Sequence, residues 1–382
     1  MTPLTWTLVL LSVAATLRLP EGVHGLPQET LLSDTENAYN PIPSPDGKMI
    51  AFVRTGRWEK GSGGQGRSNL KSEVMVMDTE GHLITAEPLA DAFLQGWTQN
   101  GKQLICYRDH KYYLVSFDGK KSRQVDIPFD MTGSSNTKSV RGAYLPHLDA
   151  MVFVEYLNSS PRQSQRKPVI GVIRTGEKEV ARFDDWSLGD MLVPSPDGRY
   201  IAAISDKYID SHLRVYDTLD KSWADLGRIV IHPAITYAGA NNDWEWMQAS
   251  WNPWFADSSR LAFIANGSIV VGTPDGTSKE TIAQIGDKVG LATPSPDGHS
   301  IAYVTFETQV HPTQPHWTFW GNTTIWVVPN APGSRARAVT QRNADTTYCL
   351  RWLNSSEIVF DRFDEGYHFS SRHRLWKVRV DQ

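Results

Sequence analysis

Aromatic, imidazole and amide side chains concentrate in three stretches of this sequence. The stretches lie between residues 229 and 248, around residues 307–322, and around residues 362–373. Aromatic faces with a few convergent polar groups are the usual lining of a ligand site. The candidate ligand-binding residues are Trp244, Trp246, His311, His316, Trp317, Trp320, Tyr367, His368 and Arg372. These residue types suit a carbohydrate or a peptide.

Two other interpretations of these residues stay open. The aromatics could pack on one another, because long loops need an apolar core of their own. The imidazoles could hold a transition metal, with the candidate ligands His311, His316, His368 and His373. No local spacing requires a metal, so we assign no metal ligands.

The strands that position these stretches are indicated by a repeated sequence, a Pro-Ser-Pro-Asp-Gly turn followed by a short apolar strand. Intact copies begin at Pro43, Pro194 and Pro294, and degraded copies lie between them. Asp-Gly and Asn-Gly favour the positive φ of a tight hairpin turn. The aligned landmarks are Asp46, Asn100, His147, Asp197, Asp257, Asp297 and Asn354. A period of about 50 residues indicates a repeat architecture.

Each repeat continues with further apolar strands. In the first unit they are Ile50–Arg54, Glu73–Asp78 and His82–Ala86, joined by short turns. Four antiparallel strands in each of several repeats are typical of a β-propeller. We therefore predict an all-β fold, a single β-propeller over residues 26–382 with seven four-stranded blades. Six blades are the alternative.

Loop lengths differ between the two expected faces of the propeller. Within a blade, the turns from the first to the second strand and from the third to the fourth strand are short, as in Thr79–Gly81, Thr218–Asp220 and Thr273–Gly276. The long insertions are all second-to-third loops or connections between blades, and they include the three aromatic stretches. Loops on a rigid scaffold commonly carry binding residues. The sequence therefore predicts the ligand site on the long-loop face.

Ring closure is also predicted. The last repeat lacks a fourth strand, and the segment Glu29–Ser33 precedes the first landmark, so we expect it to pair with Leu375–Val380. Such pairing covers an otherwise bare sheet edge. Cys106 and Cys349 fall in blades that are not neighbours, beyond disulfide reach, and we expect both to be buried and unbridged.

Composition and the N-terminus bear on destination and partners. The 382 residues are 40% hydrophobic and 21% charged with net charge −4, which argues against nucleic acid or an anionic membrane as partner. The apolar run Leu4–Leu17, followed by Val23-His24-Gly25, is typical of a secretory signal peptide and is too short for a membrane span. We expect residues 1–25 to be removed and a periplasmic or secreted monomer to result.

The Ser-Pro-Asp-Gly turn followed by Ile-Ala-Phe/Tyr-Val resembles the repeats of TolB-type propellers, which also occur in prolyl-oligopeptidase-like enzymes. The resemblance covers nearly the whole mature chain. It implies a periplasmic, non-enzymatic binding scaffold, although the chain lacks room for the α/β domain that precedes the TolB propeller. The peptidases attach a hydrolase domain with Gly-x-Ser-x-Gly, a pentapeptide that is absent from this sequence.

No recognisable catalytic motif or cofactor site supports an enzyme. Gly61–Gly66 matches G-x-G-x-x-G in spacing but leads into a strand, whereas a dinucleotide site opens a helix. We expect no cofactor. The favoured function is an exported binding or scaffold propeller that recognises a protein, peptide or glycan through its long-loop face. The alternative is a polysaccharide lyase or hydrolase that uses the same face, with or without a histidine-bound metal.

Overall fold

The fold was derived from a computed structural model. It describes residues 27–33, 37–55, 72–109, 111–125, 138–145, 150–158, 166–174, 181–183, 188–205, 212–230, 251–310, 318–341, 347, 349–363 and 373–380. These residues form strands, turns and connections without a helix, so the all-β prediction is confirmed. No helix within them is long and apolar enough to cross a membrane.

The strands form seven antiparallel sheets, which we number in chain order. The first three sheets contain β2 (Ala38–Pro43), β3 (Met49–Thr55), β4 (Ser72–Asp78) and β5 (Leu89–Ala90); β6 (Phe93–Trp97), β7 (Gln103–Arg108), β8 (Lys111–Ser116) and β9 (Ser122–Gln124); and β10 (Lys138–Leu145), β11 (Ala150–Asn158), β12 (Arg166–Arg174) and β13 (Ala181–Phe183). In each sheet, consecutive strands are neighbours.

The next three sheets contain β14 (Leu188–Pro194), β15 (Tyr200–Ser205), β16 (His212–Asp217) and β17 (Ser222–Arg228); β18 (Leu261–Ala265), β19 (Ser268–Gly272) and β20 (Lys279–Gln284); and β21 (Val289–Pro294), β22 (Ser300–Val310), β23 (Thr318–Pro329) and β24 (Arg337–Ala338). The seventh contains β25 (Leu350–Asn354), β26 (Glu357–Phe363), β27 (His373–Arg379) and β1 (Glu29–Leu31).

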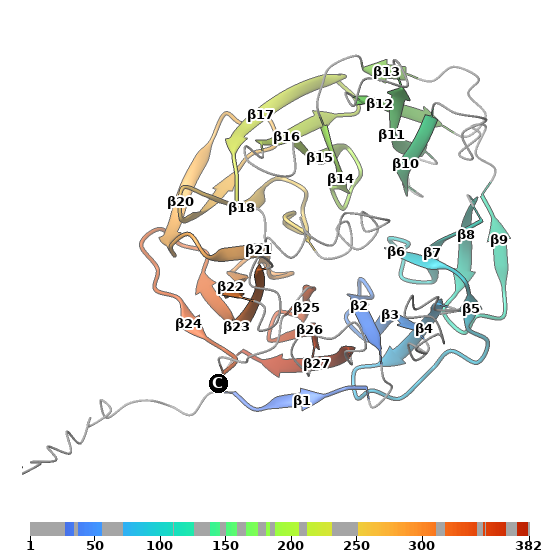
Figure 1. The fold of residues 1–382 in the computed structure, drawn as a ribbon, viewed down its shortest axis with the longest axis horizontal. Coiled ribbons are helices and arrows are strands. Elements are labelled where there is room, and N and C mark those ends of the chain that lie inside the picture. Colours follow the sequence, from blue (N-terminus) through green and yellow to red (C-terminus); the bar gives the residue numbers. More distant parts are fainter. Residues whose placement is uncertain are drawn as a thin grey trace, which may run out of the picture.

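Figure 1 shows the sheets arranged radially around a centre, with the first sheet beside the last. Six sheets have the four strands of a propeller blade, and the fifth shows three within the described residues. The N-terminal strand β1 pairs antiparallel with β27, from Glu29 opposite Val378 to Leu31 opposite Trp376. The predicted propeller and its closure by an N-terminal strand are thus confirmed.

One strand prediction in the first sheet is wrong. The fourth strand is β5 rather than His82–Ala86, where only Leu83 forms an isolated bridge to Met77. The reason is a side-chain contact: the Thr85 hydroxyl accepts a hydrogen bond from the Val76 amide at 2.6 Å. The chain therefore continues past the turn before it joins the sheet.

The core lies between the sheets. Along each inner strand, alternate side chains pack against the preceding or the following sheet, because successive residues of a strand point to opposite faces. In the seventh sheet, Leu350 and Phe360 pack toward the sixth sheet, whereas Leu353 and Val359 pack toward the first. Both cysteines are buried and unbridged, as predicted.

The repeated turns have the predicted geometry. Gly47, Gly198 and Gly298 all have φ between 67° and 73°. In the first turn the Asp46 carboxylate accepts hydrogen bonds from the Ser44 hydroxyl at 2.7 Å and the Lys48 amide at 3.2 Å. The same Ser/Thr-x-Asp/Asn contact recurs in other short turns of this face. The turns are therefore closed by their own side chains.

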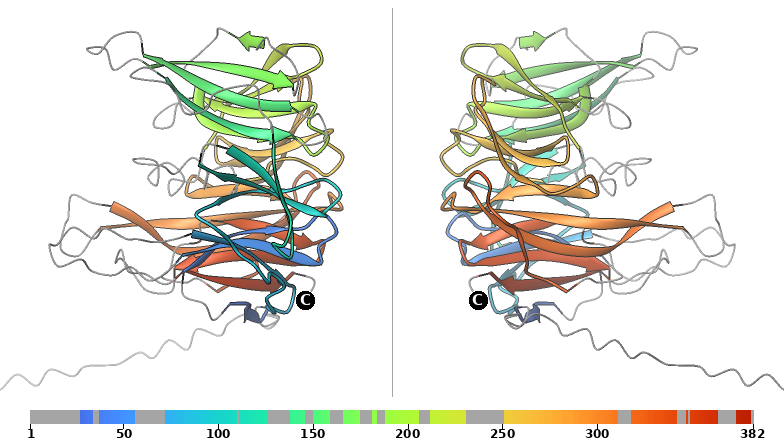
Figure 2. Two further views of the ribbon diagram at one scale, coloured as in Figure 1. Left: turned by 90° about the vertical axis from the view of Figure 1, so that its right-hand side faces the viewer. Right: turned by 90° about the vertical axis from the view of Figure 1, so that its left-hand side faces the viewer.

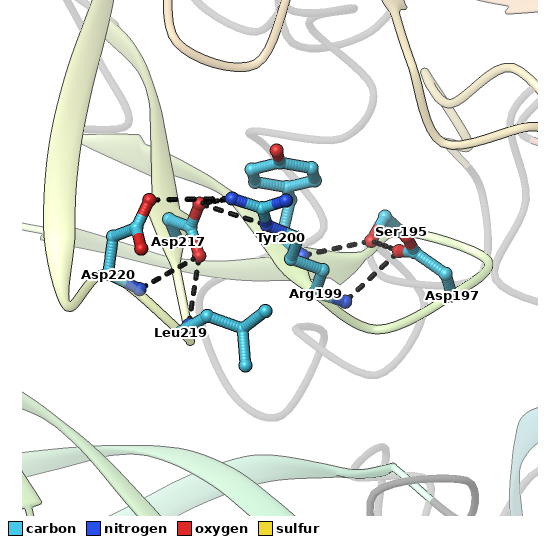
Figure 3. Close-up of polar contacts among 7 residues, drawn as sticks. All are labelled: Ser195, Asp197, Arg199, Tyr200, Asp217, Leu219 and Asp220. Carbon is cyan, nitrogen blue, oxygen red and sulfur yellow. Dashed lines mark hydrogen bonds and ion pairs between the residues drawn. The ribbon is translucent and has the colours of Figure 1, made fainter.

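The fourth sheet adds a contact between its two short turns (Figure 3). The Arg199 guanidinium lies 2.8 Å from Asp217 and 3.4 Å from Asp220, and its carbon is 4.9 Å from the centre of the Tyr200 ring. Burial raises the pKa of Asp217, but hydrogen bonds from Arg199 and from two backbone amides outweigh it and hold the pKa below its usual value. The polar side chains of these short turns are thus bonded to one another and to the turn backbone.

A hydrogen bond that the repeat pattern does not predict joins neighbouring sheets. One position near the end of the inner strand lies opposite the first core residue of the second strand. This position is proline in the first, fourth and sixth sheets and tryptophan in the second, fifth and seventh. Each indole donates to the carbonyl that precedes the proline of the preceding sheet. The pairs are Trp97 to Ile42 at 2.8 Å, Trp254 to Val193 at 2.9 Å and Trp352 to Thr293 at 3.0 Å.

Candidate functional site

The long-loop face is distinguished by projecting hairpins. β22 and β23 have 11 and 12 residues, and β11 and β12 have nine each, compared with five to seven in the corresponding strands of the other sheets. Figure 2 shows both hairpins extending to the same side of the ring, opposite the short turns. The stretch predicted as an insertion from Glu307 to Asn322 is therefore largely strand, because both strands continue into it.

Most predicted binding residues lie outside the described residues. These are Trp244, Trp246, His311, His316, Trp317, Tyr367, His368 and Arg372. Trp320 is the exception: its backbone lies on β23 in the projecting part of the hairpin, opposite Thr308 of β22. The prediction that these residues form one site stays a prediction.

The described residues place a different polar group at the same end of the ring. β26 ends and β27 begins at the long-loop face, and β25 and β2 begin there, because the strands are antiparallel. Within two residues of these strand ends lie Asn40, Cys349, Arg351, Asp361 and His373, each at most 9% exposed. We call these five residues the seam cluster, since they lie between the seventh and first sheets.

Strand alternation explains why the cluster faces the first sheet. Leu353, Val359 and Leu375 pack against the first sheet, and Arg351, Asp361 and His373 are each two residues from one of them. Residues two apart on a strand share a face. Three adjacent strands of the last sheet therefore each contribute one ionisable side chain to this seam.

Asp361 is the centre of the hydrogen bonding in the seam cluster. Its carboxylate accepts the Cys349 amide at 2.7 Å and the Asn40 amide at 3.3 Å. Asn40 has φ 56° and occupies an irregularity of β2, where the ladder register shifts between Tyr39 and Ile42. The carboxylate thus satisfies a backbone amide that the bulged strand cannot pair.

Burial sets the protonation of the cluster. It lowers the pKa of His373 to about 3, so the imidazole is neutral at ordinary pH, and the ring lies 5.8 Å from that of Tyr39. Burial likewise raises the pKa of the Cys349 thiol and lowers that of Arg351. A protonated thiol is a poor nucleophile, so Cys349 is suited to packing and weak hydrogen bonding.

Two further charged contacts lie at the outer side of the last sheet. Arg362, whose side chain is 4% exposed, lies 2.6 Å from Glu29 of β1 and its carbon is 5.0 Å from the ring centre of Phe360. Lys377 donates to the Thr79 carbonyl at 2.7 Å and lies 3.1 Å from Glu80. The Arg362 contact holds β1 within the last sheet, and the Lys377 contacts join that sheet to the first.

Among the described residues, no group of three or more His, Cys, Asp and Glu side chains could hold a metal ion. His373 is the described member of the predicted metal-ligand group, and burial keeps it inside the seam. Sequence reasoning missed Asp361 and Arg351. The available signal was a charged residue at an inward position, as in Leu-Arg-Trp-Leu and Val-Phe-Asp-Arg.

No family model and no curated protein match the chain. Among solved structures, it is similar to Pyrococcus horikoshii acylaminoacyl peptidase, with 10% identity over 86% of this chain and 49% of that chain and a TM-score of 0.53. It is also similar to an acylaminoacyl peptidase in complex with Z-Gly-Gly-Phe-chloromethyl ketone, with 10% identity over 91% of this chain and 52% of that chain and a TM-score of 0.53. TolB from Acinetobacter baumannii is 11% identical over 88% of this chain and 80% of that chain, with a TM-score of 0.35.

These comparisons support the fold. The chain spans about half the length of the two acylaminoacyl peptidases that it matches. At such identities the likeness extends to the propeller architecture alone.

Proposed function

We propose that this protein is an exported binding propeller that recognises a protein, peptide or glycan through its long-loop face. The observation that carries the proposal is the difference between the two faces. One face consists of short turns closed by their own Ser/Thr and Asp side chains. The other carries the projecting hairpins β11–β12 and β22–β23. An elaborated rim on a rigid scaffold is the usual place for recognition.

The seam cluster is consistent with a binding site on the long-loop face. Its buried, hydrogen-bonded side chains fix the starts of β2 and β25 at the long-loop end of the ring. A rigid base of this kind keeps loop residues in place and lowers the entropy that binding costs. The acylaminoacyl peptidase likeness adds peptides to the ligands worth testing first.

The proposal counts the fifth sheet as a complete blade, which gives seven. Trp254 forms an antiparallel bridge with Leu261, the position at which the inner strand of other sheets meets the second strand. Its indole also donates to the fourth sheet, as the equivalent tryptophans of the second and seventh sheets do to theirs. The segment through Trp254 therefore takes the place of an inner strand.

The alternative, a polysaccharide lyase or hydrolase on the same face, draws on one feature. Buried ionisable groups such as those of the seam cluster also occur in active sites. An enzyme would show turnover of the captured polymer, whereas a binding protein returns it unchanged.

The experiment screens the secreted chain against glycan and peptide arrays and measures affinity for the strongest hit. We expect Trp244→Ala and Trp317→Ala to weaken capture by about thirtyfold, because aromatic truncation at a binding centre costs about 2 kcal/mol or more. The matched control is Leu219→Ala, on a short-turn loop where Leu219 is 60% exposed, and it should leave affinity unchanged.

Unchanged affinity with a large loss of melting temperature in the tryptophan variants would show that they are only loop core. The same preparation tests export: its N-terminal residue should lie near Leu26, and an intact Met1 in the cytoplasm would contradict it.

A further inference from the structure

The second sheet carries a concentration of positive charge. Six basic and two acidic residues lie between Phe93 and Val125, although the whole chain has net charge −4. The exposed basic residues are Lys102, Lys111, Lys120, Lys121 and Arg123. Phe117, one of the few exposed large apolar residues among those described, lies in the same turn as Lys120. We call residues Phe117–Gln124, which comprise this turn and β9, the basic edge.

The basic edge differs from other charged regions in how its charges are used. Several basic side chains of other sheets are paired with carboxylates, as Arg54 is with Glu73 and Arg362 is with Glu29. Within the part of the chain that the structure describes, none of the five exposed basic residues of the second sheet forms an ion pair. The nearby Asp118 accepts hydrogen bonds from the Ser116 hydroxyl at 2.6 Å and the Lys120 amide at 3.1 Å, which engages it within the turn.

The backbone of β9 is also available. The strand lies at the outer edge of its sheet, next to β8 alone. The Lys121 carbonyl accepts the Ser116 amide at 2.8 Å and the Val125 amide donates to Tyr112 at 2.8 Å, so these odd-numbered positions point toward β8. Since antiparallel strands alternate the direction of their backbone groups, Ser122 and Gln124 point their amide and carbonyl groups outward.

We propose that the basic edge binds an acidic, extended polypeptide segment, which adds to the second sheet as a strand beside β9. Main-chain hydrogen bonds to Ser122 and Gln124 supply register. Lys121 and Arg123 lie two residues apart, about 7 Å along one face of the strand, which matches carboxylates at alternate positions of a partner strand.

A peptide fits this edge better than an anionic polysaccharide does. A polysaccharide could neutralise the lysines, but it has no repeating amide and carbonyl groups at the spacing of a strand. The hydrogen-bonded turn at Phe117–Lys121 holds Gly119 at φ 80°, so the edge is rigid before the partner arrives. Edge lysines also discourage strand addition by neutral or basic segments, which makes the same charges selective for an acidic one.

The test uses the full chain and a fluorescein-labelled peptide of about ten residues with alternating Thr and Glu, sized to one strand. Fluorescence anisotropy is measured at low and high salt. Lys121→Glu with Arg123→Glu should weaken binding about tenfold or more through lost charge complementarity. The matched double reversal, Arg335→Glu with Arg337→Glu beside the outer edge of β24, should leave binding unchanged.

A proline substitution separates strand addition from simple charge attraction. Gln124→Pro removes an outward amide that the ladder does not use, so the sheet is retained. It should weaken peptide binding about fivefold, the value of one hydrogen bond, and Gln124→Thr should not. Circular dichroism of each variant checks the fold.

Three results would overturn the proposal. The first is no binding of the Thr-Glu peptide, which would leave edge protection as the role of these lysines. The second is equal binding of the Gln124→Pro and Gln124→Thr variants. The third is displacement of the peptide by polygalacturonate that is as effective against Gln124→Pro as against the unaltered chain.

Discussion

Two seams of the ring are closed by different chemistry. Between the first and second sheets, the Trp97 indole donates to the Ile42 carbonyl, and both groups are neutral. Between the seventh and first sheets, the Asp361 carboxylate accepts the Asn40 amide, and the Lys377 ammonium donates to the Thr79 carbonyl and lies 3.1 Å from Glu80. The first seam joins segments that follow each other along the chain, whereas Asn40 and Asp361 are 321 residues apart.

The difference teaches where directional bonds are needed. Adjacent sheets of one chain are brought together by a short connection, so apolar packing and one neutral hydrogen bond complete the contact. The terminal seam has no covalent link, and closing a long loop costs entropy that grows with its length. Hydrogen bonds to charged groups contribute more than neutral ones when their geometry is good. The ring has hydrogen bonds to charged groups at the terminal seam, where no covalent connection holds the two sheets together.

Acid should act on the terminal seam first, and this is the largest expected effect. The unfolded chain binds a proton at His373 below a pKa of about 6.5, whereas folded His373 binds one only near pH 3. Between these values the unfolded state binds more protons, so stability falls as the pH falls, by up to about 1.4 kcal/mol per pH unit. Urea unfolding at pH 6.5, 5.5 and 4.5 measures this slope.

The control for acid sensitivity is His373→Gln, which cannot titrate. Its stability should change much less over the same range, because turn aspartates such as Asp46, Asp217 and Asp297 have pKa values held below the usual value by their hydrogen bonds and stay ionised. A His373→Gln variant that keeps the full slope would show that other groups cause it.

Removing the charged acceptor should cost more than removing the neutral donor. Asp361→Ala leaves the buried amides of Asn40 and Cys349 without their acceptor and should lower the free energy of unfolding by about 2–4 kcal/mol. Trp97→Phe keeps an aromatic ring and loses one neutral hydrogen bond, for about 1 kcal/mol. Denaturant titration of both variants compares the seams directly, and equal losses would contradict the distinction.

The short turns offer a finer comparison of the same two seams. Gly47 and Gly101 have nearly equal φ, 68° and 66°, so alanine should strain each by about 1 kcal/mol. A Cβ at Gly47 would lie 2.5 Å from the Leu353 carbonyl oxygen of the last sheet, whereas one at Gly101 would lie 3.4 Å from the Pro45 side chain. Gly47→Ala should therefore lower the melting temperature further than Gly101→Ala, and the reverse order would show that this face of the terminal seam is loosely packed.

The propeller could be predicted from the sequence because its signals are local. Pro-Ser-Pro-Asp-Gly specifies a turn, and Ile-Ala-Phe specifies the strand that follows, wherever the unit lies in the ring. The N-terminal strand was predictable by elimination, since the last repeat lacked a partner for Leu375–Val380. The prediction of a strand at His82–Ala86 fails because the Thr85 hydroxyl, rather than a backbone carbonyl, accepts the Val76 amide, which interrupts the ladder before β5.

The seam cluster could not be predicted because its contacts are long-range. Strand alternation marks Asp361 as an inward residue, but its partner Asn40 is brought to it only when the ring closes. Most of the predicted binding residues fall in sequence insertions that are not repeated, so strand periodicity does not predict whether they come together. The five exposed basic residues of the second sheet are visible in the sequence, but only the fold shows that no described carboxylate forms an ion pair with them.

The alternation of proline and tryptophan at the ends of the inner strands has a consequence for rearranging the chain. Each tryptophan depends on a proline-bearing sheet immediately before it, so the sheets of the ring are not interchangeable. A circular permutant that begins at the third sheet would keep every indole directly after its acceptor in the chain. One that begins at the second sheet would place Trp97 and Ile42 in opposite terminal sheets, and the new closing seam would then depend on a neutral hydrogen bond. Among the six sheets that carry this proline or tryptophan, the smallest unit that can be moved or duplicated intact is a pair of sheets.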